Sequence, residues 1–398
     1  MLKRISLVFF GDGVAKALNL AATLYILKML NVSDYANFTI LFASVMLSYQ
    51  SVCGVFERFY ISDYKNFNDI YFTASLMLGT PVLIIGYSYL NYANYEIVVE
   101  FFLIGYIFFF LFQSLRIFYQ KAEFFKSFVI TDFIRNIVWL SFLLVFWLLN
   151  LNLSFNLVAL SFVASAAISV IFIFLFGMKN INVPKIYISP SLIKQSLFYL
   201  KDRNELFLYA LAAGFFPYIP VVASMLLSSE NVVASYGAAM RFQAIFSMCI
   251  YSLHVVFLPR IVGLNSKEAI ALLKSFYRKL PYLIIGMFVV AFIVINLIDI
   301  LDLDKFQGLK TCFLFFAGCS ILSMSSTPAA SYLLSNKKYR VLFSAMGLGL
   351  LVVIILVPLM LMVSEFYGIL GALLIAYLAI CVFLLIGASQ VIHENINN

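Results

Sequence analysis

The feature that most constrains this chain is a repeated series of apolar runs, each about 20 residues long, separated by short polar breaks. A run of that length, coiled as an α-helix at about 1.5 Å per residue, crosses the roughly 30 Å hydrocarbon layer of a bilayer. Only 11% of the 398 residues are charged, which is too few to cover the surface of a soluble protein of this size. A transmembrane β-barrel would show short segments of alternating polarity instead. The sequence therefore predicts an all-α integral membrane protein.

The apolar runs predict about twelve transmembrane helices. Their approximate bounds are 5–30, 37–58, 69–90, 97–118, 128–150, 153–177, 205–228, 232–258, 280–300, 307–334, 340–363 and 367–390. The loops between them support this count, because every second loop is rich in Lys and Arg. Such loops face the cytoplasm by the positive-inside rule. One helix more or fewer would invert half of the loops, so both termini are expected in the cytoplasm.

The polar residues also exclude several classes of function. The net charge of +8 follows from the basic loops, so no nucleic-acid partner is predicted. The five cysteines and two histidines lack the spacing of metal ligands, so neither a metal nor another cofactor is predicted. No loop is long enough to fold into a soluble catalytic domain. The chain is therefore not expected to be an enzyme.

The longest polar stretch, residues 179–204, divides six predicted spans from six and contains Pro184 and Pro190. This layout is typical of transporters built from two repeats. It predicts an N-terminal lobe over residues 1–178, a cytoplasmic linker over 179–204 and a C-terminal lobe over 205–398.

Five charged residues fall deep inside predicted spans. A charge at mid-membrane costs roughly 3 kcal/mol on insertion scales, so it normally faces a partner or a water-filled cavity. Asp12 and Lys16 are four residues apart and share one helix face, and Asp132 and Arg135 are three apart. Arg241 lies near the middle of its span, with no acidic residue within one turn along the sequence. Together these residues carry a net charge of +1, which suits an anionic substrate because arginine binds phosphate oxygens through two donors.

Each of these charges also has a purely structural interpretation. Asp132 and Arg135 are explained equally well as a buried pair that holds helices together or as groups that face a cavity. Lys28 and Arg116 lie near span ends, where a long basic side chain extends to the membrane surface. Arg58 at the inner end of its span has the same interpretation. In the seventh span, prolines 217 and 220 remove backbone hydrogen bonds and predict a kink.

Two stretches resemble a known family. Residues 15–42 read AKALNLAATLYILKMLNVSDYANFTILF, a span with a basic end followed by an LxxxxYxxF turn. Residues 235–261 read SYGAAMRFQAIFSMCIYSLHVVFLPRI, with a mid-span arginine and a terminal Phe-Leu-Pro-Arg. Together they resemble the Wzx-type flippases of O-antigen and capsule pathways, in the multidrug/oligosaccharidyl-lipid/polysaccharide (MOP) exporter superfamily. The length and the six-plus-six division agree with that family over the whole chain.

The resemblance implies a MATE-like fold, with two six-helix lobes around a central cavity that opens alternately to each side of a bacterial inner membrane. The implied substrate is an undecaprenyl-pyrophosphate-linked oligosaccharide, moved from the cytoplasmic to the periplasmic leaflet. The family lines its cavity with basic residues, and the matching positions here are Lys28 and Arg241. Lys28 stands where arginine is common, and Asn31 and Asn37 stand where glycine is frequent, so the chain departs from the family at its outer turn.

We therefore expect a flippase in which Arg241, Lys16, Arg135 and Lys28 bind the anionic lipid-linked oligosaccharide. Asp12 and Asp132 are expected to balance charge or to couple an ion, either a proton or sodium. Two alternatives stay open. A MATE-type drug/cation antiporter has the same architecture, but a net positive cavity disfavours cations. An O-antigen polymerase has a similar length and composition, but such enzymes carry a large periplasmic loop that this sequence lacks.

Overall fold

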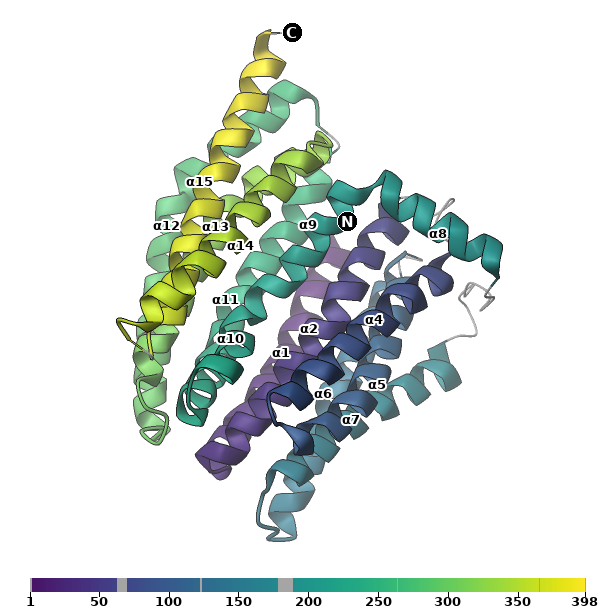
Figure 1. Ribbon diagram of the computed structural model, residues 1–398. Helices are drawn as coiled ribbons and strands as arrows, with labels where there is room; N and C mark the ends of the chain where they lie inside the picture. Colours follow the sequence, from purple (N-terminus) through teal and green to yellow (C-terminus); the bar gives the residue numbers. More distant parts are fainter. Residues whose placement is uncertain are drawn as a thin grey trace. The chain divides into compact units, whose positions relative to one another are not determined.

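The computed structural model describes residues 2–62, 70–121, 124–177, 189–262, 264–364 and 366–397, and these form helices joined by short turns (Figure 1). Within these ranges, ten helices are long and apolar enough to cross a membrane. Two further helices, α1 (Leu2–Met29) and α11 (Glu230–Val262), occupy the remaining positions at which spans were predicted. The prediction of an all-α membrane protein is confirmed. By its contacts the chain forms two compact units, Met1–Leu226 and Leu227–Asn398.

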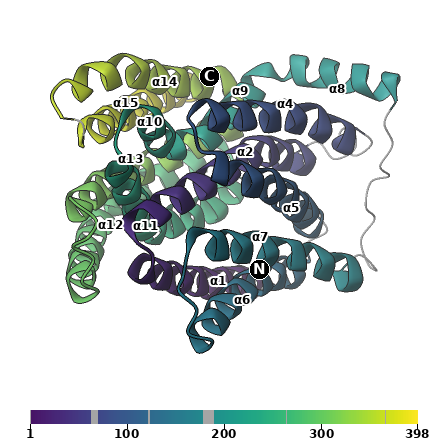
Figure 2. The ribbon, with the colours of Figure 1, turned by 60° about the horizontal axis from the view of Figure 1, so that its bottom comes forward.

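The first unit begins with α1 and contains most of the described charged residues that were predicted to lie deep in the membrane. Its other helices are α2 (Val32–Ser62), α4 (Tyr71–Tyr92), α5 (Glu96–Lys121), α6 (Phe125–Leu148), α7 (Phe155–Phe172), α8 (Pro190–Asp202), α9 (Asn204–Phe215) and α10 (Ile219–Leu227). A short π-helix, Ile173–Gly177, continues α7. Within this unit α6 packs against α1 and α7, and α5 packs against α2 and α7 (Figure 2).

Aromatic side chains fill the space between α2, α5, α6 and α7. Trp139 is fully buried and lies 5.5 Å from the Phe162 ring and 6.1 Å from the Phe38 ring, centroid to centroid. Phe162 also stacks on Phe109 at 4.6 Å. Helix packing inside a membrane depends on such van der Waals contact, because lipid is as apolar as the side chains themselves. Trp139 lies one turn along α6 from Arg135, so this packing fixes the helix face that carries the deep charges.

The predicted kink in the seventh span is present. Helix α9 ends at Phe215, a 3-10 turn covers Phe216–Tyr218, and α10 begins at Ile219. The turn contains Pro217, which has no N–H to donate to the preceding turn. Tyr218, from this break, donates a hydrogen bond to Gln50 Oε1 of α2 at 3.2 Å.

The residues predicted to form a linker contain a helix. Residues 178–188 lie outside the described ranges, but α8 follows them, and α9 then packs against α2 within the first unit. By its contacts, α9 therefore belongs to the first unit and not to the unit formed by the helices that follow it. The division into lobes 1–178 and 205–398 stays a prediction.

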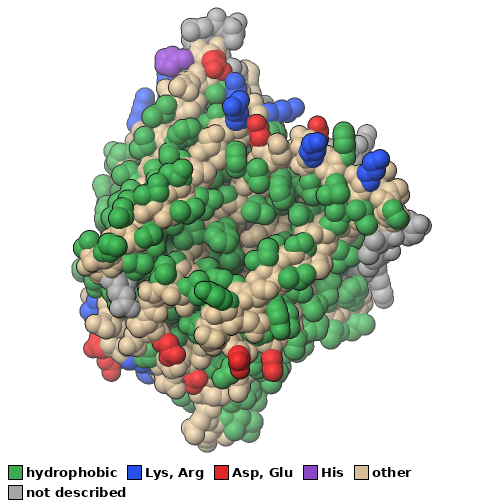
Figure 3. All heavy atoms as spheres, in the orientation of Figure 1, with side chains coloured by type: hydrophobic (Ala, Val, Ile, Leu, Met, Phe, Trp, Pro, Cys, Tyr) green, Lys and Arg blue, Asp and Glu red, His purple; other side chains and the backbone are tan. Residues whose placement is uncertain are grey.

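The second unit is organised around α13. It comprises α11, α12 (Ser266–Ile300), α13 (Leu309–Ser335), α14 (Tyr339–Leu361) and α15 (Gly368–Asn397). Helix α13 packs against α11, α12 and α15, and α14 packs against α15. In each unit, on the face that Figure 3 shows, hydrophobic side chains cover the middle of the helices and charged ones gather toward their ends, as a bilayer requires.

A close helix contact in the second unit yields a testable prediction. A Cβ atom on Gly368 would lie 2.6 Å from the backbone carbonyl of Met360, whereas a Cβ on Gly347 would meet nothing within 4 Å. Gly368→Ala should therefore destabilise the protein by about 1–3 kcal/mol through overpacking. Gly347→Ala should be neutral or stabilising by up to about 1 kcal/mol, because alanine is the better helix former. Melting temperatures of the two variants in detergent check this, and equal melting temperatures would contradict it.

Candidate functional site

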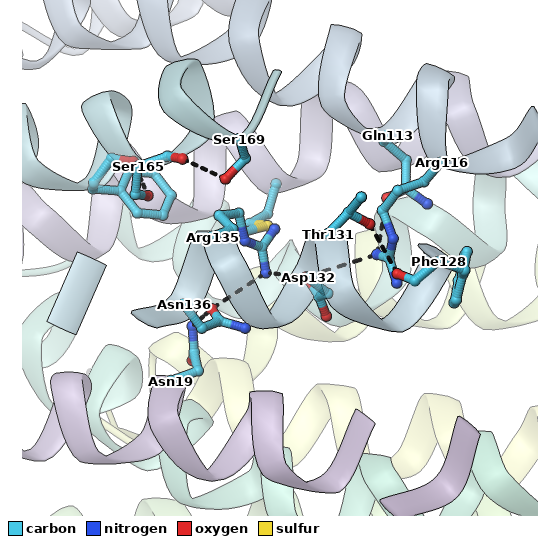
Figure 4. A network of polar contacts seen from close by, with 12 residues as sticks. Asn19, Gln113, Arg116, Phe128, Thr131, Asp132, Arg135, Asn136, Ser165 and Ser169 are labelled. Atoms are coloured by element: carbon cyan, nitrogen blue, oxygen red, sulfur yellow. Dashed lines mark hydrogen bonds and ion pairs between the residues drawn. The ribbon is translucent and has the colours of Figure 1, made fainter. Parts of the chain in front are cut away.

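Asp132 and Arg135 of α6 form an ion pair inside the first unit. The Arg135 guanidinium lies 2.9 Å from Asp132 Oδ1, across the three-residue spacing that the sequence suggested (Figure 4). The carboxylate is buried and the guanidinium nearly so. Asp132 lies about two turns inside α6 from its first residue, Phe125. The pair therefore lies within the span and not at its surface.

Arg116 of α5 approaches the same carboxylate. One of its terminal nitrogens lies 3.8 Å from Asp132 Oδ1 and donates a 3.4 Å hydrogen bond to Gln113 Oε1. The guanidinium carbon lies 4.0 Å from the centre of the Phe128 ring, a cation–π contact. Arg116 is only 9% exposed, so the expectation that it extends to the membrane surface is wrong. Its ion pair and the aromatic face hold it inside the unit.

Amide groups extend this cluster to α1. Asn19 donates from its side chain to Asn136 Oδ1 at 3.2 Å, and the same oxygen accepts a longer, 3.5 Å hydrogen bond from Arg135 (Figure 4). Asn136 is buried. Neither asparagine was predicted from the sequence. The available signal was that Asn136 adjoins the deep arginine, since a buried amide normally requires a hydrogen-bond partner.

Three basic side chains act on the Asp132 carboxylate. Arg116 and Arg135 contact it, and Lys16 of α1 is near enough to attract it. Two guanidinium groups therefore share one carboxylate. Asp12, the other acidic residue expected here, has a side chain outside the described part of the structure. We call the group formed by Lys16, Arg116, Asp132 and Arg135, with the amides of Asn19, Gln113 and Asn136, the polar cluster of the first unit.

Aromatic rings cover the arginines of the polar cluster. The Arg135 guanidinium carbon lies 5.0 Å from the centre of the Phe112 ring and 5.5 Å from that of Phe109. Rings in these positions stabilise a guanidinium without neutralising it. Such an arginine keeps its positive charge and its N–H donors, both of which an anion can use.

The two other predicted basic residues lie elsewhere. Arg241 belongs to α11 in the second unit and is 8% exposed, as expected for a deep arginine. Two residues further on, Gln243 donates to Ser320 of α13 at 3.2 Å, which fixes α11 against its neighbour. Lys28, in the last turn of α1, is exposed. The structure brings Lys16, Asp132 and Arg135 together within one unit. Lys28 lies about three turns beyond Lys16 along α1, at the end of that helix.

Comparison with known proteins identifies the fold. No protein-family model and no curated protein matches the sequence. Among solved structures, the lipid II flippase MurJ in an inward closed conformation matches with a TM-score of 0.69 and 16% identity, over 96% of this chain and 87% of that one. An inward-facing multidrug resistance MATE family transporter of the MOP superfamily matches at 0.68 and 13%, over 96% of each chain. The MATE multidrug transporter DinF-BH matches at 0.67 and 16%, over 98% of this chain and 94% of that one.

These matches span nearly the whole chain, so the protein has the fold of MOP-superfamily transporters and is a multi-pass membrane protein. The prediction of a MATE-like fold is confirmed. At these identities the likeness is one of fold, and it is shared by a lipid flippase and by multidrug transporters. The cargo must be inferred from the residues of this chain.

Proposed function

We propose that the chain is a flippase for an oligosaccharide linked to a polyprenyl pyrophosphate, moved across the bacterial inner membrane from the cytoplasmic to the periplasmic leaflet. The observation that carries this proposal is that two guanidinium groups inside the first unit share one carboxylate. Arg116 is buried and Arg135 nearly so. Two arginines that share one carboxylate keep positive charge and N–H donors for a second anion. A substrate that brings negative charge would pair with them.

A pyrophosphate fits the donors of the cluster. Guanidinium groups bind phosphate oxygens through two parallel hydrogen bonds. Arg116 Nε is buried and has no hydrogen-bond partner among the described residues, so it offers a donor that an anion would satisfy. The amides of Gln113 and Asn19 lie beside the arginines and suit the polar groups of a sugar. Arg241 supplies a further buried guanidinium in the second unit.

Asp132 gives the proposed cycle a way to release its cargo. Its carboxylate holds Arg135 when no substrate is bound, at 2.9 Å. A pyrophosphate that takes over Arg135 leaves Asp132 beside a like charge, unless the carboxylate binds a proton or a sodium ion. Substrate and carboxylate therefore compete for one arginine, and Asp132 is the proposed ion-coupling residue together with Asp12. The polyprenyl tail stays in lipid while the head group crosses, as alternating access requires.

The charge of the cluster also distinguishes this proposal from the drug/cation antiporter. An organic cation would have to bind beside two arginines that share a single carboxylate. Like charges at such distances repel. A polymerase would need catalytic side chains on a large loop, and the described loops are short turns.

A binding competition tests the proposal. The purified protein should bind a short-chain polyprenyl-pyrophosphate oligosaccharide about tenfold more tightly than the matching monophosphate, because the second phosphate adds charge-assisted hydrogen bonds. A rhodamine-type cation should not displace it. Microscale thermophoresis in detergent measures both. Equal affinity for the two lipids, or displacement by the cation, would count against the pyrophosphate assignment.

A further inference from the structure

Helix α8 has a capped N-terminus. The Ser189 hydroxyl accepts a hydrogen bond from the backbone N–H of Leu192 at 3.3 Å, and Pro190 occupies the first turn. Both features stabilise a helix start. The helix runs for 13 residues, too short to cross a bilayer. It therefore lies outside the set of spans.

One face of α8 is fixed to the rest of the first unit. Ser196 and Leu200, four residues apart, are buried. Tyr199 packs edge-on against Phe59, near the end of α2, with ring centroids 5.4 Å apart. Figure 1 shows α8 running across the ends of α2 and α4. Those ends belong to the loop that the charge pattern assigns to the cytoplasm, so α8 lies at the level of the lipid headgroups of that leaflet.

The opposite face of α8 is both apolar and basic. Leu197 and Phe198 are 55% and 73% exposed, so this face presents two neighbouring large apolar side chains. Lys194 and Lys201 are exposed and seven residues apart, so they lie on this same face. Asp202 is rotated by about 100° from Lys201. Figure 3 shows basic side chains among hydrophobic ones over this helix.

An open cavity of about 500 Å³ lies at one edge of this face, where α8 meets the start of α4. Its lining residues are Ile70, Ser191, Lys194, Gln195, Phe198 and Tyr199. The polar members, Ser191, Lys194 and Gln195, follow one helical stripe and provide hydrogen-bond donors. The other members, Ile70, Phe198 and Tyr199, are apolar or aromatic. The cavity therefore combines hydrogen-bond donors with apolar walls.

We propose that this cavity binds the headgroup of an anionic phospholipid from the adjoining leaflet, with Lys194 holding the phosphate inside the cavity. Lys201, outside the cavity on the same helix face, attracts the phosphate, and Leu197 and Phe198 insert beside the acyl chains. A soluble anion would use the lysines but leave the exposed leucine and phenylalanine without an apolar partner. An anionic phospholipid supplies both a negative charge for the lysines and acyl chains for the apolar residues. Other basic amphipathic helices bind membrane surfaces in the same way. The site is separate from the polar cluster, so the inference does not rest on the proposed cargo.

Lipid retention by the full-length protein tests this. Native mass spectrometry in detergent would compare phosphatidylglycerol with phosphatidylcholine of the same acyl chains. The unmodified protein should prefer phosphatidylglycerol. Lys194→Gln/Lys201→Gln should weaken its tightest phosphatidylglycerol site about tenfold, because each lysine near an anionic surface contributes favourably. Phosphatidylcholine binding should not change.

A matched control is available on α12. Lys267 and Lys274 are also exposed and also seven residues apart, and neither of them lines the cavity at α8. Lys267→Gln/Lys274→Gln should retain phosphatidylglycerol like the unmodified protein. The proposal is wrong if the α8 variant loses no phosphatidylglycerol, if it loses both lipids equally, or if the α12 variant loses as much.

Discussion

Asp132→Ala should destabilise the protein by about 3–5 kcal/mol, the range for removing one partner of a buried ion pair. The substitution leaves the guanidinium groups of Arg116 and Arg135 buried without the carboxylate that they share at 3.8 and 2.9 Å. Their mutual repulsion then opposes the packing of α5 against α6. Thermal melting of the purified protein in detergent measures the effect. Asp304→Ala, which removes an exposed aspartate from a loop, should leave the melting temperature unchanged.

A double variant separates this repulsion from simple loss of packing. Asp132→Ala/Arg135→Ala removes the carboxylate and one of the two arginines, so Arg116 no longer has a like charge beside it. The double variant should therefore lose less unfolding free energy than the two single variants lose in sum. The difference, the interaction energy of the pair, should be about 0.5–3 kcal/mol. Strictly additive effects would mean that the two residues do not interact energetically in the folded protein.

Arg135→Ala should lower transport of the lipid-linked oligosaccharide by about 10- to 100-fold, the loss expected for one charge-assisted hydrogen-bonding group of about 1.5–3 kcal/mol. Arg241→Ala should have an effect of the same order, because Arg241 is the further guanidinium proposed to bind the anion. Arg135→Lys should be intermediate, because lysine keeps the charge but cannot form two parallel hydrogen bonds. The rate at which surface polysaccharide appears in cells that depend on the variant measures these effects.

The control for this series is Arg278→Ala, since Arg278 lies exposed on α12. It should support display at the unmodified rate. Protein abundance in the membrane must be equal across the series, because a poorly inserted variant would imitate a transport defect. Normal display with Arg135→Ala at normal abundance would exclude the anion-binding role of the polar cluster.

The positions of the spans were predictable because the bilayer imposes a length on each apolar run. The break in the seventh span was predictable for a similar reason, since the effect of Pro217 is local to its own helix. The pairing of Asp132 with Arg135 also follows from spacing along one helix. These features depend on residues close together in the sequence.

The remaining parts of the polar cluster depend on which helix faces meet. Arg116 approaches Asp132 from α5, and Asn19 reaches Asn136 from α1. Nothing in the sequence around Arg116 distinguishes a buried arginine from one that extends to the membrane surface. Only the packing of three helices makes the distinction.

Helix α8 was missed for another reason. Its residues lie in the most polar stretch of the chain, which was assigned to a linker on composition alone. The signal was present, because Ser189 followed by Pro190 is a typical helix start. Leu197 and Leu200, three residues apart in that stretch, were a further sign of helical periodicity.

The most direct test of the account is flipping by the purified protein in proteoliposomes. A fluorescent polyprenyl-pyrophosphate oligosaccharide would be placed in both leaflets, and the fraction accessible to an impermeant glycosidase would be followed over time. We predict that the unmodified protein makes the inner-leaflet pool accessible and that the Arg135→Ala/Arg241→Ala variant does not. Failure of the unmodified protein to flip this lipid, together with uptake of an organic cation, would contradict the account and assign the chain to drug transport.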